Sequence, residues 1–180
     1  MIDHQLIQDC KQGKRDAMKR LYELTLPVMH GVCLRYAADK YEAEDFTQEG
    51  YLKVFSQIES FRYQGSFEGW MRKVIVNNCL QLIKQKNRIH FEILAPDKDG
   101  AYEEYNDEEN YAIGKKLIVM MQQLPDGYRT ILNLFIIEEF SHHEIAKALN
   151  ISVNTSKSQL HRAKEKLRKL IEAELKADRL

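Results

Sequence analysis

Glycine, proline and cysteine are all scarce in this chain, which has 8 glycines, 3 prolines and 3 cysteines among 180 residues. Glycine and proline mark most turns, and no run of alternating strand-type residues is present, so the sequence predicts an all-α fold. Cys10, Cys33 and Cys79 are odd in number and widely spaced, and no Cys/His pair has zinc-site spacing. We therefore expect buried, reduced thiols, with no disulfide framework, metal site or cofactor.

Long apolar runs are also missing from the chain. The longest, Ile131 to Ile137, is far too short to cross a bilayer. The N-terminal stretch MIDHQLIQDCKQGK lacks the apolar core of a signal peptide. These features predict a soluble, cytoplasmic protein with no membrane insertion.

The chain carries no net charge, because 27 basic and 27 acidic residues balance. The two signs are nevertheless segregated. Between Gly69 and Phe91 there is no acid, whereas acids dominate from Glu92 to Glu109. Because binding depends on the local field, the neutral total does not argue against a nucleic-acid partner. The bases of the first stretch are Arg72, Lys73, Lys84, Lys86 and Arg88.

Hydrophobic periodicity divides the chain into two helical parts. The pattern fails between residues 88 and 110, a stretch rich in acids that contains Pro96 and Asp99-Gly100. This composition is typical of a flexible acidic linker. We predict two small helical domains, residues 1–88 and 111–180, joined by a linker over 89–110. Helices are expected over residues 3–12, 14–38, 41–58, 67–87 and 111–123.

The segment from Leu124 to Leu170 predicts three further helices with very short joints. Pro125 can open the first, in which Ile131, Leu132, Phe135 and Ile136 recur at helical spacing. Ser141 with Glu144 has the form of a capping box and starts the second. A turn over residues 150–153 leads into the third. This order is a helix-turn-helix, which presents its second helix to the DNA major groove.

The last of these helices has an outward face suited to that task. Short hydroxyl, amide and basic side chains contact base edges and phosphates. The alternative is the ordinary solvated face of a surface helix, but spacing, caps and side-chain chemistry together favour DNA. The outward positions are Asn154, Thr155, Lys157, Ser158, Gln159, His161, Arg162 and Lys164.

The helix over residues 41–58 carries two different stripes. Carboxylates, an amide and one leucine share a side at i, i+3, i+4 and i+7, as in a docking surface for another protein. On these residues alone, a solvated helix face is the preferred interpretation. Asp45 with Glu49 could also be a pair of metal-binding or acid–base carboxylates, but this is not the preferred interpretation. The first stripe is Asp45, Gln48, Glu49 and Leu52; the second, expected in the core, is Phe46, Gly50, Val54 and Ile58.

The segment from Ser60 to Lys73 places aromatic residues beside cations. Single-stranded nucleic acid needs this combination, since bases stack on rings while Lys and Arg hold the phosphates. A base extruded from its stack could also be bound in such a loop. Alternatively, Phe61, Phe67 and Trp70 are core residues. For Phe67 and Trp70, this is the preferred interpretation. Arg62, Tyr63 and Gln64 are the better candidates for contact.

Together the two parts resemble a bacterial sigma factor of the extracytoplasmic-function (ECF) group of the sigma-70 family. AEDFTQEGYLKVFSQIESF followed by SFEGWMRKVIVNN is similar to the pattern of the family's domain two. LPDGYRTILNLFIIEEFSHHEIAKALNISVNTSKSQLHRAKEKLRKL resembles domain four. Many regulators carry a helix-turn-helix, so it is the two blocks in this order that make the match specific.

The resemblance implies three binding surfaces. It places the stripe of Asp45, Gln48, Glu49 and Leu52 on the β′ clamp helices of RNA polymerase, which reverses the preference for a solvated face. It assigns the helix-turn-helix residues, above all Lys157, Ser158, Gln159, His161 and Arg162, to the −35 element. The residues implied at the −10 element or melted strand are Phe61, Arg62, Tyr63, Gln64, Arg72, Lys73, Asn77, Lys84 and Arg88.

The implied partners are core RNA polymerase, through its β′ clamp helices and β flap, promoter DNA, and an anti-sigma factor. Two positions depart from the family pattern. Gln81 stands where an aspartate is usual, and the basic run from Lys84 to Arg88 is thinner than arginine-rich versions. Both leave the strength of the strand contacts open.

The function implied is therefore that of a sigma factor, which directs promoter recognition, strand opening and initiation without being an enzyme. The main alternative is a helix-turn-helix regulator that binds a two-fold symmetric operator as a dimer, without polymerase. An enzyme has the least support, because no serine lies in a nucleophile-elbow context and no Gly-rich phosphate loop is present.

Overall fold

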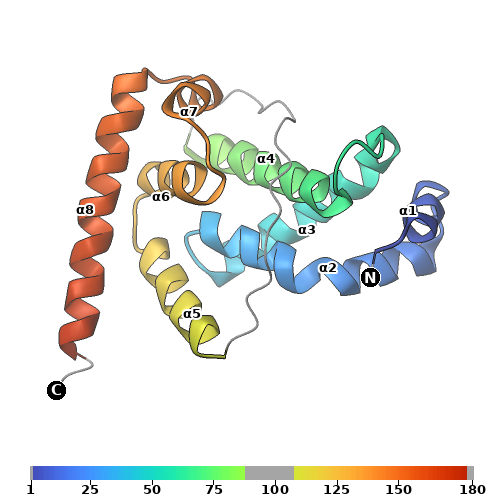
Figure 1. Cartoon of the computed structure of the whole chain (residues 1–180), viewed down its shortest axis with the longest axis horizontal. Coiled ribbons are helices and arrows are strands. Elements are labelled where there is room, and N and C mark those ends of the chain that lie inside the picture. The colour runs from blue at the N-terminus through green and yellow to red at the C-terminus, as the bar shows by residue number, and fades with distance from the viewer. Residues whose placement is uncertain (1, 88–107, 178–180) are drawn as a thin grey trace.

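The all-α prediction is confirmed by the computed structural model, which describes residues 2–87 and 108–177 and has eight α-helices and no strand within them (Figure 1). The four expected helices of the first domain are present, with ends within two residues of the predicted positions. They are α1 (His4–Lys11), α2 (Arg15–Tyr36), α3 (Lys40–Gln57) and α4 (Phe67–Asn87), with a 3-10 turn at Ile58–Ser60.

The second domain follows the predicted helix-turn-helix order. Its helices are α5 (Glu108–Gln122), α6 (Asp126–Leu132), α7 (His142–Leu149) and α8 (Val153–Ala177), with a π-helical turn at Asn133–Ile137. Residues 108–110, expected in the linker, are therefore helical. The rest of the expected linker, and Arg88 before it, lie outside the described residues.

The core of the first domain forms where α2, α3 and α4 pack together. The predicted inward stripe of α3 is confirmed, because Phe46, Gly50, Val54 and Ile58 are all buried. The helices α3 and α4 approach closely at Gly50, where an added Cβ would lie 3.1 Å from Ile75 Cγ1. The three cysteines are free and buried, as expected.

Most of the local signals of the helix-turn-helix act as predicted. Ser141 and Glu144 form the capping box of α7, and Asn150 ends that helix in the left-handed region at φ 50°. Pro125 is the cap residue directly before α6. Ile136 is the exception: it is 51% exposed, because the π-helical turn shifts the register of the apolar stripe.

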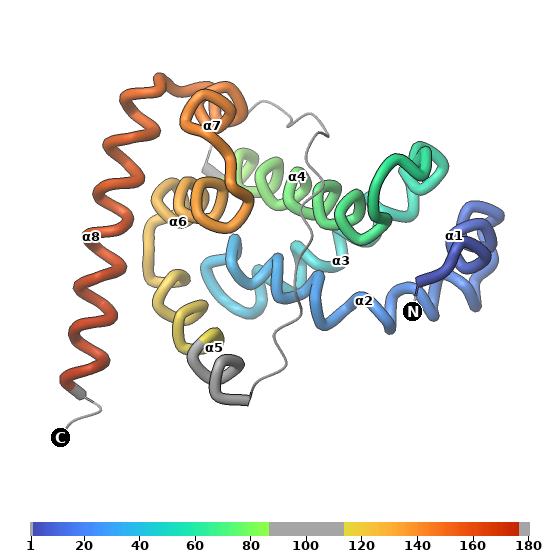
Figure 2. Tube along the Cα trace, in the orientation of Figure 1, coloured from blue at the N-terminus to red at the C-terminus, as the bar shows by residue number. Residues whose placement is uncertain are grey.

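The two domains are packed against each other through the carboxyl end of α2, which meets α5 and α6. In Figure 2, α1 lies at one end of the molecule and α8 at the other. Within the described residues, no helix has the length and apolar character needed to span a membrane.

Candidate nucleic-acid interface

The outward stripe of α3 is exposed along its whole length. Asp45, Gln48 and Glu49 face solvent, and Leu52 is 64% exposed. Beside this stripe, α2 and α3 form an open groove of roughly 350 Å³. This surface offers carboxylates, an apolar side chain and a recess, which suits a protein partner better than DNA. The groove is lined by Tyr22, Leu26, Pro27, His30, Glu44, Thr47 and Gln48.

The loop before α4 separates into a buried end and an exposed middle. Phe61 is only 4% exposed and packs on Phe67 and Trp70, with ring centroids 5.1 and 5.6 Å apart. Phe67 is buried and Trp70 half-buried, so the preferred core interpretation of both agrees with the structure. Arg62, Tyr63 and Gln64 are exposed. Of the loop residues assigned to the −10 element, Phe61 thus lies inward and the other three outward.

The first helix holds this loop, a contact that sequence reasoning missed. Gln8 Nε2 donates to Tyr63 Oη at 2.7 Å, and Lys11 Nζ donates to the Phe61 carbonyl at 2.7 Å. The His4 ring stacks on Tyr63 with centroids 4.7 Å apart. The i, i+4, i+7 spacing of the three α1 residues was visible in the sequence, but nothing in it pointed to their partner.

The basic residues of α4 are engaged within the protein. Arg72 is 9% exposed and forms a two-pronged ion pair with Glu138, with N···O distances of 2.9 and 3.0 Å. Lys73, Asn77 and Lys84 are half-buried and also have interactions inside the structure.

The nearby Lys86 is likewise engaged, since its ammonium group pairs with Glu42 at 2.8 Å. The hydrogen bond from the Lys86 ammonium to the Glu42 carboxylate raises the pKa of Lys86, which keeps the ammonium charged. The cations described in this basic stretch therefore have partners within the protein, and those of Arg72 and Lys86 lie in other helices or segments.

The carboxyl end of α2 is capped by the second domain, which sequence reasoning also missed. A helix leaves its last four carbonyl groups without partners inside the helix. The Ala37 N–H takes one of them, the Cys33 carbonyl. The other three carbonyls accept hydrogen bonds from side chains of the second domain. The Leu34 carbonyl accepts from Gln122 Nε2 at 3.2 Å, the Arg35 carbonyl from Asn133 Nδ2 at 2.7 Å, and the Tyr36 carbonyl from Arg129 Nε at 2.9 Å.

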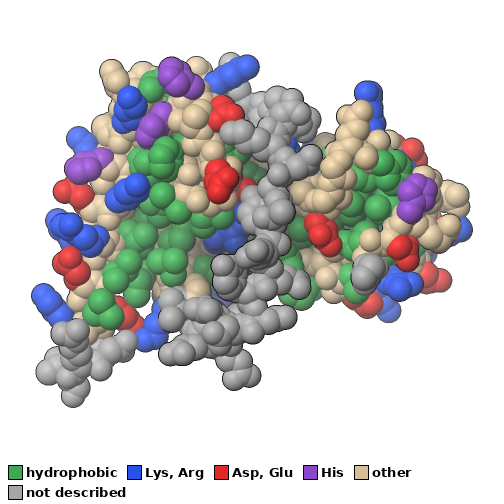
Figure 3. All heavy atoms as spheres, in the orientation of Figure 1, with side chains coloured by type: hydrophobic (Ala, Val, Ile, Leu, Met, Phe, Trp, Pro, Cys, Tyr) green, Lys and Arg blue, Asp and Glu red, His purple; other side chains and the backbone are tan. Residues whose placement is uncertain are grey.

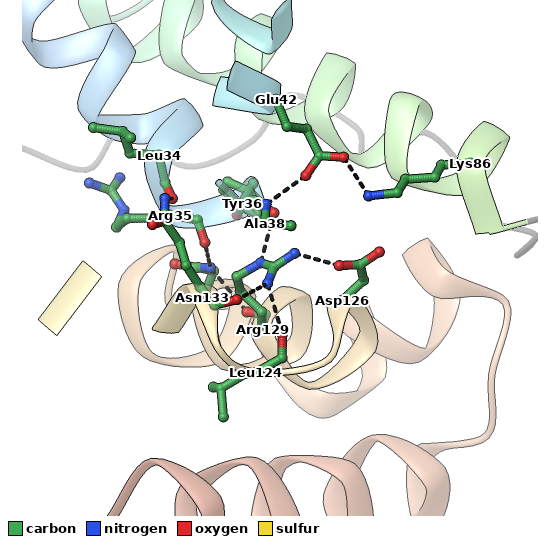
Figure 4. Close-up of polar contacts among 11 residues, drawn as sticks. Leu34, Arg35, Tyr36, Ala38, Glu42, Lys86, Leu124, Asp126, Arg129 and Asn133 are labelled. Carbon is green, nitrogen blue, oxygen red and sulfur yellow. Dashed lines mark hydrogen bonds and ion pairs between the residues drawn. The ribbon is translucent and has the colours of Figure 1, made fainter. Parts of the chain in front are cut away.

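Arg129 is the centre of this contact between the domains (Figure 4). Its side chain is 1% exposed, and besides Tyr36 it donates to the carbonyls of Gln122 and Leu124 and pairs with Asp126. Burial lowers the pKa of the guanidinium, and the Asp126 carboxylate opposes that shift. A cation at a helix carboxyl end is also favoured by the helix dipole. A single charged group thus joins α2, α5 and α6.

The outward face of α8 is held mainly by contacts within its own helix, such as His161 with Glu165 at 3.7 Å; Lys164 Nζ also lies 5.4 Å from the centroid of the Phe135 ring. Of the eight predicted contact residues, only Thr155 and Gln159 are half-buried, and the others are exposed. Figure 3 shows Lys, Arg and His side chains along α8 and beside α7, on the side away from the first domain. Ser152 Oγ accepts from the Thr155 N–H at 3.0 Å and so caps the helix start. This face can contact DNA without any rearrangement of α8.

The joint between α7 and α8 is held by His142. Its Nδ1 lies 3.0 Å from Ser156 Oγ, and its ring stacks on Phe135 at 4.7 Å between centroids. Burial, and then the charges of Lys157 and Lys164, lower the pKa of His142. The lowered pKa favours the neutral imidazole. Among the described residues, no group of three His, Cys, Asp or Glu side chains could hold a metal ion.

Two family models match this chain. Sigma-70 region 2 matches residues 21–89, and Sigma-70, region 4 matches residues 115–167. The first match covers most of α2 and all of α3 and α4, and the second covers the helix-turn-helix. The two matches follow the order of the two domains along the chain.

Two curated relatives are similar over most of the chain. The ECF RNA polymerase sigma factor SigE of Mycolicibacterium smegmatis is 31% identical over 144 residues, 78% of this chain and 56% of that protein. The ECF RNA polymerase sigma factor SigW of Bacillus subtilis is 29% identical over 180 residues, 94% of this chain and 96% of that protein. The chain thus spans about half the length of the former and nearly all of the latter.

One solved structure with the same fold is the sigma factor RpoE in complex with the anti-sigma factor NepR, from Bartonella quintana. The two chains superpose with a TM-score of 0.50 and 19% identity, over 86% of this chain and 96% of the other. This likeness concerns the fold alone.

Proposed function

This chain belongs to the ECF group of the sigma-70 family, and from that premise we propose how its two domains divide the work of a sigma factor. The chain binds core RNA polymerase and directs promoter recognition, strand opening and transcription initiation. It acts in the cytoplasm, where polymerase and promoter are found, and it catalyses no reaction itself. The observation that carries this division is the pair of exposed surfaces, on α3 and α8, on separate domains.

The first domain binds core polymerase through α3. The exposed stripe of Asp45, Gln48, Glu49 and Leu52 docks on the β′ clamp helices, and the groove beside it accepts an apolar side chain of the partner. The β flap is the polymerase contact of the second domain. The exposure of all four stripe residues supports this assignment, because a docking surface has to be accessible before the complex forms.

The second domain reads the −35 element with the amino-terminal half of α8. Arginine and lysine pair with guanine, and glutamine pairs with adenine, in the major groove. Lys157, Gln159 and Arg162 supply these groups, and Asn154, Ser158 and His161 lie on the same half of the helix. Support comes from the exposed position of this face and from the capped, fixed start of α8.

The first domain also reads the −10 element, with the loop before α4 and the basic face of α4. Arg62 and Gln64 are exposed and contact the extruded base, while Arg72, Lys73, Asn77, Lys84 and Arg88 hold the melted strand. Arg72 can hold the melted strand only after its ion pair with Glu138 breaks, because this pair is formed while the two domains are packed together.

Simultaneous reading of both elements requires the domains to separate. A compact chain of this length has a radius of gyration of about 16 Å. The roughly 25 base pairs between positions −35 and −10 measure about 85 Å of duplex. Residues 88–107 between α4 and α5 could span up to about 70 Å if fully extended. The packed arrangement is therefore a state of the free protein, and the promoter-bound state is open.

This division of labour is tested with two sets of substitutions. Arg162→Ala and Lys157→Ala should lower promoter binding by the holoenzyme about tenfold while core binding is unchanged, since each bidentate contact to a base contributes roughly 1–3 kcal/mol. Asp45→Ala and Gln48→Ala should weaken core binding in a pull-down and leave selectivity of the remaining holoenzyme unchanged. Equal effects of both sets on core binding would contradict the proposal.

The alternative of a dimeric regulator makes a different prediction for the isolated chain. It requires tight binding to a two-fold symmetric duplex without polymerase, whereas a sigma factor should start transcription only when core enzyme is added. In vitro transcription from a random promoter library, with and without core, separates the two. An anti-sigma factor is the regulatory partner that we propose, by analogy with the solved RpoE–NepR pair. Co-purification from the native host tests it.

A further inference from the structure

We propose that α1 is a brace for the loop over residues 61–66, which makes His4, Gln8 and Lys11 positioning residues for −10 recognition. The proposal rests on the assignment of this loop to the −10 element. It adds a part of the chain that lies before the residues matched by the region 2 model, which begin at residue 21. Without this brace the loop would not hold the conformation in which it meets the base.

The contacts between α1 and the loop involve three side chains on one face of the helix. His4, Gln8 and Lys11 are spaced i, i+4 and i+7, and so share a side of α1. Gln8 holds the Tyr63 hydroxyl and Lys11 holds the Phe61 carbonyl, both at 2.7 Å. Lys11 Nζ also lies 4.6 Å from the centroid of the Tyr63 ring. One helix face therefore fixes both the backbone at the start of the loop and the ring at its centre.

Buried residues behind and beside this face anchor α1 in the domain. Leu6, Ile7 and Cys10 are 6%, 5% and 2% exposed and belong to the core. Asp3 caps the helix by accepting from the Leu6 N–H at 2.8 Å. Because α1 is fixed to the core, its contacts with the loop hold the loop in place.

The loop needs such support because its centre is strained. Tyr63 has φ 58°, in the left-handed region. An L-residue with a bulky side chain is disfavoured there by roughly 1–2 kcal/mol. Gly65, also at positive φ, carries no such penalty. A free loop would relax at Tyr63, and the contacts from α1 oppose that relaxation.

The brace also assigns different roles to neighbouring loop residues. The Tyr63 ring contacts His4, Lys11 and Phe61. Arg62 and Gln64 on either side of it are exposed, and neither has a polar partner within the described part of the chain. Tyr63 therefore positions the loop, and Arg62 and Gln64 read the base. The glutamine amide offers both a donor and an acceptor to a base edge.

The first experiment measures strand opening by the holoenzyme. Full-length Gln8→Ala and Lys11→Met are combined with core polymerase on a promoter selected from a random library, with a fluorescent base analogue in the −10 element. Each variant should slow opening about fivefold, the effect of one lost hydrogen bond, with unchanged core binding. Lys11→Arg, which keeps the donor and the cation, should restore the rate. Gln5→Ala is the matched control, because Gln5 lies on α1 and, within the part of the chain that the structure describes, its side chain bonds only Asp9 of the same helix.

The second experiment measures the loop directly in the free protein, independently of polymerase. Amide hydrogen exchange over residues 62–66 should become about fivefold faster in Gln8→Ala and Lys11→Met, and stay unchanged in Gln5→Ala. Tyr63→Phe removes the same hydrogen bond as Gln8→Ala, so the double variant should exchange no faster than either single one. Unchanged exchange in the two brace variants would overturn the proposal.

A third pair of variants separates failure of the brace from failure of the loop assignment. Arg62→Ala and Gln64→Ala should slow opening and reduce discrimination among bases at the captured position. If they do so while the α1 variants open at the normal rate, the brace is overturned and the loop assignment stands. If Arg62→Ala and Gln64→Ala leave opening unchanged, the loop is not the −10 reader and both proposals fall.

Discussion

The recognition face of α8 and the −10 region of the first domain differ in what holds their contact residues. On α8, the polar residues point outward because the helix buries Leu160 and Ala163 on its other side. In the −10 region, Tyr63 is held by Gln8, 55 residues earlier, and Arg72 by Glu138, 66 residues later. The first surface is built from adjacent residues and the second from distant ones. A change far away in the chain should therefore reach the −10 region and leave the α8 face unaffected.

The largest effect is expected at Arg129, where the two domains meet. Arg129→Met fills a similar volume but leaves the buried carbonyls of Tyr36 and Leu124 without the Arg129 donor and removes the ion pair with Asp126. It should lower the free energy of unfolding by about 3 kcal/mol, as breaking a buried charged contact does. Urea unfolding measures it. Arg162→Met on the exposed face of α8 is the control, with a change below roughly 0.5 kcal/mol; equal losses would refute the contrast.

A smaller effect is expected when the ion pair between Arg72 and Glu138 is broken. Glu138→Gln removes the charge that faces a buried guanidinium and should cost about 2 kcal/mol, typical of hydrogen bonds to charged groups. The domains should also separate more readily, which small-angle scattering detects as a larger radius of gyration. Glu139→Gln, at the exposed neighbour, is the control. A compact Glu138→Gln variant of unchanged stability would show that this contact does not hold the domains together.

The capping box tests the local side of the comparison. Ser141→Ala removes the hydroxyl that accepts from the Glu144 N–H and should destabilise the protein by about 1 kcal/mol. Hydrogen exchange over residues 61–66 should not change, because no contact among the described residues links this cap to the loop. Ser56→Ala, an exposed serine inside α3, is a suitable reference. Faster exchange in the loop of Ser141→Ala would mean that the two regions are coupled.

The smallest effect is a pH dependence at the joint of α7 and α8. His142 has a lowered pKa in the folded protein, so the unfolded chain binds a proton at a higher pH than the folded one. Its contribution to stability is complete above the unfolded pKa of about 6.5 and is lost as pH falls through the folded value. Thermal unfolding between pH 7.5 and 5.5 should show this decline in the native protein and a flatter profile in His142→Gln. An equally steep profile in His142→Gln and in the native protein would show that another group causes the decline. The matched control is His143→Gln.

Sequence reasoning reached as far as local patterns extend. The ends of α1 to α4, the α3 core stripe and the capping box at Ser141 follow from periodicity and cap chemistry, which involve residues at most a few turns apart. The π-helical turn that exposes Ile136 was not predicted, because no local residue signals it. The buried position of Phe61, the pair at Arg72 and the role of Arg129 depend on packing between segments distant in the chain. Such contacts leave no periodic trace in a single sequence.

The capping of α2 by Gln122, Arg129 and Asn133 has a consequence for work with fragments. A fragment that stops near residue 88 would end α2 with three carbonyls that only water can satisfy, so its final turn should fray. The same helix lines the groove beside the α3 stripe, through Tyr22, Leu26, Pro27 and His30. A truncated first domain would thus report a polymerase affinity measured on a loosened scaffold, and should melt at a lower temperature than the intact chain.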